Sequence, residues 1–307
     1  MRMLFMVKLF YFLILFVTIS VLYWLFYEPK EDFNFDYFDN QEGHFFPIVP
    51  NLVHYVIFDL VSIDFTTFLS MTSVIKIQQP DHLWIHCNQI LQENHYYSLI
   101  KALANLTKTK VSLHHFNPPT HVFGQPLSSI YHRSDVARIA ILSEHGGIYL
   151  DTDMLVLKPL DKFLHYEMVV AWPYNDFLGN QILIGHKEAR FLKLWLQGYR
   201  VYKPRMWYYN AGQFPTEQIL LKLPNIAHRE PEKLGVHNLI NELYERNDWD
   251  WGDYYAIHLL SRHPPAPVLN EKTLDKYNMT FGAIARWLLF KVAPSLDITS
   301  IPVKWSS

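Results

Sequence analysis

Short apolar runs alternate with longer stretches of helical character between residues 47 and 150. The apolar runs predict strands that are buried on both faces, and the stretches between them predict helices. Strands are predicted at residues 51–58, 82–87, 110–116 and 148–150, and helices at residues 65–77, 96–104 and 134–145. This alternation predicts an α/β fold with a mostly parallel sheet flanked by helices. In such sheets, ligands bind beyond the carboxyl ends of the strands.

The first apolar run of the chain is of a different kind. Residues 9–27 carry no charge, and their number is sufficient to cross a bilayer as one helix. Arg2 and Lys8 precede the run and acidic residues follow it from Glu28, which places the N-terminus in the cytoplasm. A cleaved signal peptide is the alternative, but no small-x-small cleavage site lies before Glu28. We therefore predict a cytoplasmic tail at 1–8, a transmembrane signal anchor at 9–27, a stem at 28–46 and a lumenal folded domain at 47–307.

Charge, short motifs and the cysteine count bear on the partners and the location of this protein. The formal net charge of the 307 residues is −2, and no basic run stands out, so we expect no nucleic-acid partner. Two Asn-x-Thr triplets, at Asn105 and Asn278, are candidate glycosylation sites of a lumenal domain. Cys87 is the sole cysteine, so no disulfide within the chain can form, and its place in a predicted strand indicates a buried, inert thiol.

Two carboxylates follow the strand at 148–150, in the order Asp151-Thr152-Asp153. Residues i and i+2 of an extended segment point the same way, so Asp151 and Asp153 could converge on one cation. Carboxylate oxygens suit Mg²⁺ or Mn²⁺, which leave positions open for phosphate oxygens. The alternative is a turn that ends the strand with both carboxylates in water.

The preceding helix bears on this choice. Asp135 and Arg138 are three residues apart and share a helix face, where an ordinary ion pair is the simplest interpretation. However, Gly146-Gly147 leads the chain from this helix directly into the acidic strand. We therefore expect the Asp135–Arg138 face and the two carboxylates to lie at one cleft.

Taken together, these residues resemble the DXD-containing sugar-binding region of glycosyltransferase family 32. That family includes yeast initiating α1,6-mannosyltransferases and animal α1,4-galactosyl- and α1,4-N-acetylglucosaminyltransferases. The resemblance is specific around the acidic pair and weaker over residues 47–265. It rests on Ser134, Asp135, Arg138, Leu142, Gly146, Gly147, Ile148, Tyr149, Asp151 and Asp153, followed by "LKPLD" at 157–161.

The resemblance implies a GT-A-like fold for 47–307, a nucleotide-sugar donor, Mn²⁺ or Mg²⁺, and retention of the anomeric configuration. It makes Asp153 the direct metal ligand, and Asp151 a contact of the donor's ribose and sugar that supports the metal. Asp135 and Arg138 resemble the pair that grips hydroxyls of the transferred hexose. Asn180 is similar to an asparagine that lies near the donor sugar.

Two features depart from the family pattern. Relatives often supply a late histidine, followed by an aromatic residue, to the metal or the diphosphate. Here His258 and His263 are the candidates, but leucines and not an aromatic residue follow His258. His258 could equally be a structural histidine of a strand. Residues 209–220 resemble the acceptor-side loop, but Gly212 and Pro215 are not adjacent.

The expected protein is a Golgi membrane enzyme that moves a hexose from a nucleotide sugar to a glycan or glycolipid acceptor. UDP-galactose and UDP-N-acetylglucosamine are the favoured donors, and GDP-mannose stays open. The alternative is a membrane-anchored protein that binds nucleotide sugar or glycan without turnover. An aspartyl phosphatase is disfavoured because Leu155 stands where its motif needs Thr or Val, and an EF-hand because no third acidic ligand or central glycine follows Asp153.

Overall fold

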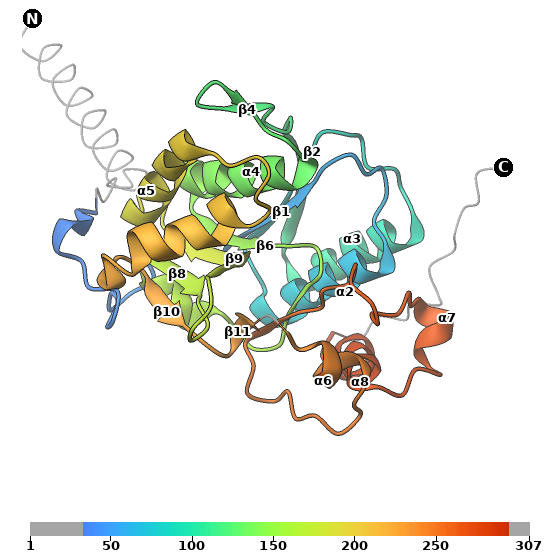
Figure 1. The fold of residues 1–307 in the computed structure, drawn as a ribbon. Helices are drawn as coiled ribbons and strands as arrows, with labels where there is room; N and C mark the ends of the chain where they lie inside the picture. The colour runs from blue at the N-terminus through green and yellow to red at the C-terminus, as the bar shows by residue number, and fades with distance from the viewer. Residues whose placement is uncertain (1–32, 237, 295–307) are drawn as a thin grey trace, which may run out of the picture. The chain divides into compact units, whose positions relative to one another are not determined.

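A seven-stranded sheet forms the centre of the computed structural model, which describes residues 33–236 and 238–294 (Figure 1). Its strand order is β10-β8-β9-β6-β1-β2-β3. Only β9 runs antiparallel to its neighbours, so the predicted α/β class and mostly parallel sheet are confirmed. The strands are β1 (Leu52–Ile57), β2 (His82–Cys87), β3 (Lys110–His115), β6 (Gly147–Leu150), β8 (Met168–Ala171), β9 (Gly179–Gly185) and β10 (His228–Glu230).

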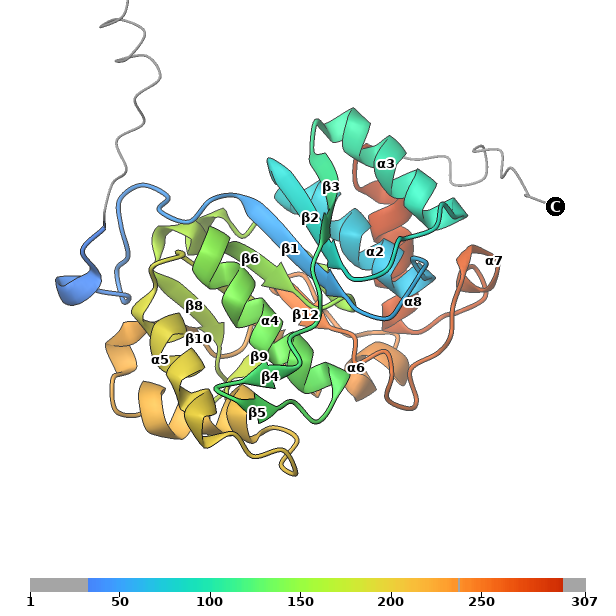
Figure 2. The ribbon, with the colours of Figure 1, turned by 90° about the horizontal axis from the view of Figure 1, so that it is seen from above.

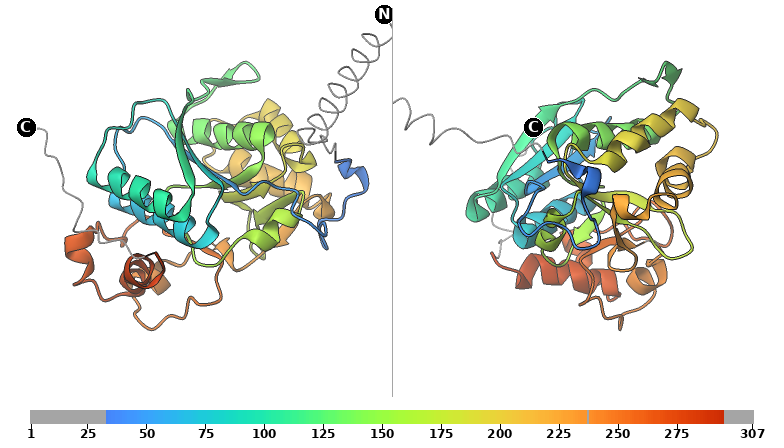
Figure 3. Two further views of the ribbon diagram at one scale, coloured as in Figure 1. Left: turned by 180° about the vertical axis from the view of Figure 1, so that it is seen from behind. Right: turned by 90° about the vertical axis from the view of Figure 1, so that its left-hand side faces the viewer.

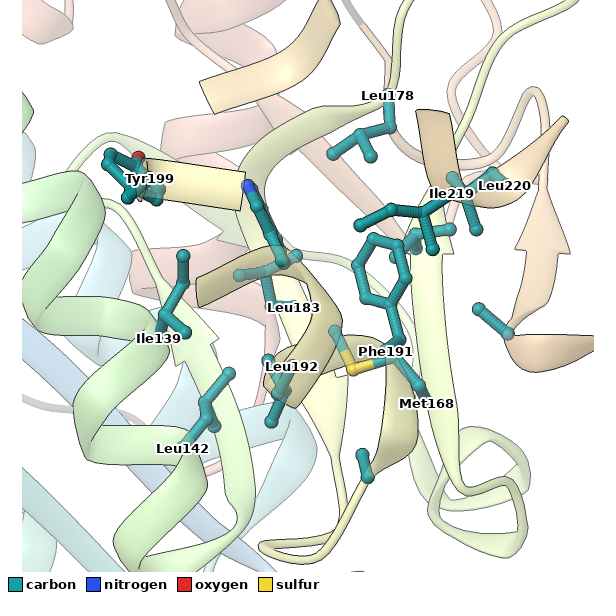
Figure 4. Packing of buried hydrophobic residues seen from close by; sticks show 14 of the residues in the cluster. Ile139, Leu142, Met168, Leu178, Leu183, Phe191, Leu192, Tyr199, Ile219 and Leu220 are labelled. Carbon is teal, nitrogen blue, oxygen red and sulfur yellow. The ribbon is translucent and has the colours of Figure 1, made fainter. Parts of the chain in front are cut away.

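Helices cover both faces of this sheet (Figure 2). Alternate side chains of β1 show the two layers: His54 bonds the carbonyl of Gly146 at the end of α4, and the Tyr55 hydroxyl bonds Ser70 of α2. The α4–α5 layer buries a large apolar cluster against β8 and β9 (Figure 4). The main helices are α2 (Phe65–Ser73), α3 (His95–Thr107), α4 (Ile130–His145) and α5 (Arg190–Gly198).

A smaller sheet joins distant parts of the chain. It has the order β11-β12-β7, and its middle strand β12 pairs antiparallel with β7 directly after the acidic pair. A two-stranded hairpin, β4 with β5, lies apart from it. These elements are β4 (His121–Val122), β5 (Gln125–Pro126), β7 (Met154–Val156), β11 (Leu234–Val236) and β12 (Ala256–His258).

The C-terminal helices pack beside α2 (Figure 3). Lys76, which follows α2, is buried and donates hydrogen bonds to the carbonyls of Leu288, Leu289 and Val292 at distances of 2.8–3.0 Å. Burial lowers the pKa of this ammonium to about 8. Because three backbone carbonyls accept its hydrogen bonds, the lysine fastens the end of the described chain to the body. The helices are α6 (Ile240–Tyr244), α7 (Glu271–Leu274) and α8 (Thr280–Arg286).

Helix α4 starts earlier than the sequence predicts. The prediction began at residue 134, but the helix begins at Ile130, and the side chain of Ser129 caps it by accepting from the amide of His132. The helix ends where Gly146 takes a φ of 67°, followed by Gly147 with a φ of 109°. A side chain on Gly147 would collide with the carbonyl of Leu52, so this tight entry into β6 needs glycine.

The N-terminal predictions fall partly outside the described residues. The expected membrane span, residues 9–27, lies outside them. Among the described residues, no helix has both the length and the apolar character needed to cross a membrane. Of the predicted stem, residues 35–46 belong to the folded unit. There the buried side chain of Asn40 donates to Glu167, and Glu167 in turn pairs with Arg190 at 2.7 Å.

Two buried histidines predict that the fold is sensitive to acid. His54 and His86 bond each other at 3.0 Å, and His54 also bonds the carbonyl of Gly146. Burial lowers the pKa of His54 to about 4 and that of His86 to about 3, whereas the ordinary value is 6.5. Below pH 6.5 these two histidines therefore bind protons in the unfolded chain but stay neutral in the folded chain.

We expect the free energy of unfolding to fall by about 2–3 kcal/mol for His54 alone as the pH drops from 6.5 towards 4. Urea unfolding at pH 7 and pH 4.5 measures this change. The variant His54→Gln controls for other groups and should show a flatter dependence over the same window. Equal slopes for the variant and the wild type would contradict the assignment.

Candidate functional site

The acidic pair lies where the chain leaves the main sheet. Asp151 follows β6 and Asp153 precedes β7, but the segment between them is a turn and not extended, with the amide of Met154 donating to the carbonyl of Asp151 at 3.1 Å. The prediction that alternation along a strand aims the two carboxylates the same way is therefore wrong. The turn brings them together instead, because the chain must bend there to pass from one sheet to the other.

Asp153 is the more deeply held carboxylate. One oxygen lies 3.2 Å from Nε2 of His258, and the other accepts hydrogen bonds of 3.0 Å from both the amide and the hydroxyl of Ser261. Burial alone would raise the pKa of Asp153, but the contacts from His258 and Ser261 outweigh it and hold this pKa well below its ordinary value. The side chain is therefore an anion throughout the physiological range.

Asp151, Asp153 and His258 form a candidate metal centre. One ligand atom from each lies within 4.8 Å of the others. Two carboxylate oxygens and one imidazole nitrogen are a donor set that Mn²⁺ accepts. His258 thus belongs to strand β12 and also joins the acidic pair, while the exposed His263 is outside this group of three.

Arg138 links the two acidic positions. Its guanidinium lies 3.1 Å from Asp151 and 3.3 Å from Asp135, and it donates to the carbonyl of Asn180 at 2.6 Å. The arginine is 5% exposed, so protein groups take up most of its hydrogen-bonding capacity. It therefore orients both carboxylates.

Asp135 and Asn180 form the other side of this network. The amide of Asn180 donates to Asp135 at 2.8 Å, joining α4 to the start of β9. Burial raises the pKa of Asp135, although Arg138 and Asn180 favour its anion. The expected convergence of Asp135, Arg138 and Asp151 is thus present, and Asn180 lies with them.

Comparison with known proteins bears directly on this arrangement. Residues 71–170, which contain Asp135, Arg138, Asp151 and Asp153, match the family described as glycosyltransferase sugar-binding region containing DXD motif. The chain carries a glycosyltransferase sugar-binding region. The family resemblance predicted from the sequence is therefore confirmed, while Asn180 and His258 lie beyond the matched residues.

Similar proteins include one curated relative and several solved structures. "Glucan organizing enzyme 1" of Cryptococcus neoformans var. grubii serotype A (strain H99) is 27% identical over 179 residues, which are 52% of this chain and 46% of that protein. The chain thus spans about half the length of this relative. The galactosyltransferase LgtC, solved with donor and acceptor sugar analogs, has a TM-score of 0.48 at 14% identity, over 83% of this chain and 98% of LgtC.

A second solved structure is the PaToxG glycosyltransferase, with a TM-score of 0.39 at 16% identity, over 58% of this chain and 71% of that one. TM-scores below 0.5 mark a partial likeness. The sheet order described above establishes the α/β fold independently of them.

The sugar-binding region opens onto two adjoining cavities. The larger, of about 350 Å³, lies beside the carboxyl end of β1 and contains Asp151, Thr152 and Asp153. The smaller, of about 180 Å³, contains Asp135, Asn180 and His258. The two cavities share four lining residues: Tyr131, Arg138, Asp151 and Arg262. They therefore form one cleft, with Asp151 between its two halves.

Sequence reasoning missed two residues that shape the region. The hydroxyl of Tyr149 donates to Asp151 at 2.7 Å, while its ring lies under the guanidinium of Arg138, 4.6 Å from the ring centroid. Its place two residues before Asp151 was a usable signal. Ser261 offered none, because its contact with Asp153 depends on the pairing of β12 with β7.

The loop compared with the acceptor side folds as two short π-helices, at Tyr209–Gln213 and Pro215–Leu220. Gly212 lies against the ring of Tyr208, where a Cβ would collide. Thr216 ties the two turns together: its hydroxyl donates to the carbonyl of Gly212 at 2.7 Å and accepts from the amide of Leu178. Gly212 and Thr216 therefore contribute to the packing of this loop.

Proposed function

We propose that the protein is a retaining glycosyltransferase that moves a hexose from a nucleotide sugar to a glycan or glycolipid acceptor. The observation that carries the proposal is the convergence of Asp151, Asp153 and His258 within 4.8 Å, at the joint of two cavities. Both carboxylates lie inside the matched sugar-binding region. Such a centre suits a ligand that has a diphosphate on one side and a sugar on the other.

The residues that would hold Mn²⁺ or Mg²⁺ are Asp153, Asp151 and His258. A divalent cation there would act as a Lewis acid for the departing diphosphate. Asp153 contributes a fixed negative charge, since His258 and Ser261 hold its carboxylate in place. Asp151 is turned toward the cleft by Tyr149 and Arg138, which bond one of its oxygens.

The nucleotide and the sugar have separate places in this proposal. The larger cavity lies at the carboxyl end of β1, where parallel α/β sheets bind nucleotides, and we assign it the nucleoside diphosphate. The smaller cavity holds Asp135 and Asn180, whose polar atoms would take the hydroxyls of the transferred hexose. Arg138 acts mainly by positioning Asp135 and Asp151.

The donor proposal names UDP-galactose and UDP-N-acetylglucosamine first, with GDP-mannose as a further candidate. The name of the Cryptococcus relative refers to glucan, so UDP-glucose belongs in the same test. These donors share a diphosphate and a hexose and differ in the base and in hydroxyl geometry. Direct comparison of their turnover therefore separates them.

The sugar side of the cleft is tested by Asp135→Asn. Losing a hydrogen bond to a charged group costs about 1.5–3 kcal/mol, so affinity for an intact UDP-sugar should fall by about ten- to a hundredfold. Affinity for free UDP should stay nearly the same, because Asp135 lies in the cavity assigned to the hexose. Calorimetry with UDP and with a non-hydrolysable UDP-sugar measures both. Equal affinities of variant and wild type for the UDP-sugar would contradict the sugar-binding role.

Membrane anchoring is a further part of the proposal. Residues 9–27 would span the Golgi membrane once, with residues 1–8 in the cytoplasm and the domain from residue 47 in the lumen. The side chains of Asn105 and Asn278 are exposed, as glycan acceptors must be. Endoglycosidase treatment of the protein made in eukaryotic cells should shift its mobility, and the protein should stay in the membrane after alkaline washing. Release of a soluble chain that begins after residue 27 would contradict the anchor.

A binding protein without turnover is the second candidate. It would keep the same cleft and the same affinity for a nucleotide sugar. The intact acidic pair, with Asp135 and Arg138 in contact with it, favours the enzyme. Release of UDP from a UDP-sugar distinguishes the two, because only the enzyme breaks the bond between the sugar and the phosphate.

A further inference from the structure

Two exposed aromatic side chains lie at the mouth of the smaller cavity. Trp207 is 60% exposed and Tyr131 is 40% exposed, and their ring centroids are 4.8 Å apart at an angle of 66°. Both side chains line the cavity that contains Asp135 and Asn180. The guanidinium of Arg262 lies over the ring of Tyr131, 4.8 Å from its centroid, so Trp207 is the more open ring of the pair. Large aromatic side chains gain free energy from burial, so an indole left in water beside a cavity points to a ligand that covers it.

The position of the pair relative to the sugar network follows from helix geometry. Tyr131, Asp135 and Arg138 are at positions i, i+4 and i+7 of α4 and therefore lie along one face. Tyr131 stands one turn beyond Asp135, towards the start of the helix. A second sugar ring that packed on these two aromatic side chains would thus adjoin the hexose proposed to lie at Asp135.

The loop that bears Trp207 is fastened on both sides. Nε2 of the buried His132 bonds the carbonyl of Trp207 at 3.1 Å, while the other ring nitrogen bonds the hydroxyl of Tyr202 at 2.6 Å. The next residue, Tyr208, donates its hydroxyl to the carbonyl of Leu178 at 2.5 Å. The loop that bears Trp207 is therefore fixed to α4, which carries Asp135, and to the start of β9, which carries Asn180. We call Tyr131 and Trp207 together the aromatic platform.

We infer that Tyr131 and Trp207 form a stacking site for one pyranose ring of the acceptor. One face of a pyranose presents C–H groups that pack on an aromatic ring, while its hydroxyls point outward to polar groups. Such a site selects an acceptor by the face that its terminal sugar presents. The inference deepens the proposed glycosyltransferase function and rests on it, because the acceptor role needs a donor sugar next to the platform.

The test uses the full chain in detergent with Mn²⁺ and with UDP. The probes are methyl β-D-galactopyranoside, methyl β-D-glucopyranoside and methyl α-D-mannopyranoside, and their binding is followed by saturation-transfer NMR and titration. At least one glycoside should bind through its C–H face. Trp207→Ala should weaken that binding by about ten- to a hundredfold, the amount expected for the loss of one aromatic face. Trp207→Phe should stay within about threefold of the wild type, because it keeps an aromatic face.

Tyr174→Ala is the matched control, since Tyr174 is 63% exposed and does not line either half of the cleft. With a turned-over donor, Trp207→Ala should raise the acceptor KM by the same factor and leave kcat within a few-fold. No glycoside bound by the wild type, or equal binding by wild type and Trp207→Ala, overturns the inference. Glycoside binding that depends on Trp207 without turnover of any nucleotide sugar would instead overturn the enzyme proposal and leave the stacking site standing.

Discussion

Replacing Asp153 by asparagine is expected to lower the rate of sugar transfer by about a thousandfold or more, as the removal of a Lewis acid worth several kcal/mol requires. The substitution keeps the size of the side chain and removes the charge that a cation needs. Its three polar contacts, one with His258 and two with Ser261, fix the carboxylate in this position.

The measurement is the initial rate of UDP release with Mn²⁺ present, for the wild type and Asp153→Asn. Asp253→Asn is the control, because Asp253 is exposed and pairs only loosely with Lys158 and Lys233. That variant should keep the wild-type rate. A fully active, metal-dependent Asp153→Asn would show that this carboxylate does not bind the cation.

Replacing Arg138 by methionine is expected to destabilise the fold as well as abolish transfer. Removing one partner of a buried ion pair costs about 3–5 kcal/mol, and the value here should lie near the lower end because Asp151 is partly solvated. Asp135 and Asp151 would then face each other without the cation that separates them. Burial already raises the pKa of Asp135, and the loss of Arg138 would raise it further.

The pH dependence gives this prediction its sign. In Arg138→Met, Asp135 takes up a proton more readily in the folded state than in the unfolded state. Protonation therefore stabilises the folded variant, and the deficit in its free energy of unfolding relative to the wild type should shrink as the pH falls from 7 to 5. Urea unfolding measures the deficit, and Arg200→Met, at an exposed arginine that bonds Gln197, controls for loss of a guanidinium. The double variant Asp135→Asn/Arg138→Met should regain part of the stability. A deficit below 1 kcal/mol at pH 7 would show that the network is not under strain from its charges.

The sequence predicts those parts of the site that lie close together in the chain. Asp135 and Arg138 share a helix face, and the glycine turn after that helix leads the chain to Asp151 and Asp153, so proximity in the chain is enough to place the four at one cleft. The strand periodicity assumed between Asp151 and Asp153 is not what brings these two together. The strands β1, β2, β3 and β6 were also predicted within a residue or two of their bounds. Their apolar runs are short and bounded by turn residues, so the sequence pattern itself marks where each strand begins and ends.

Other features depend on contacts between distant residues and were beyond such reasoning. Ser261 meets Asp153 only because β12 pairs with β7, across more than a hundred residues of chain. The turn at Asp151 to Asp153 arises because the chain passes from one sheet to another there, which no local pattern reveals. Likewise, Asn40 lies in an acidic segment that reads as a stem, yet its side chain is buried against Glu167.

The most direct test of the account is turnover of nucleotide sugars by the purified full chain. UDP-galactose, UDP-N-acetylglucosamine, UDP-glucose and GDP-mannose would each be incubated with Mn²⁺ or with EDTA, and release of the nucleoside diphosphate would be followed. The account predicts release from at least one donor with Mn²⁺, almost none with EDTA, and almost none for Asp153→Asn in either condition. A wild-type protein that binds a nucleotide sugar but releases no nucleotide from any of the four, with or without a glycoside acceptor, would contradict it.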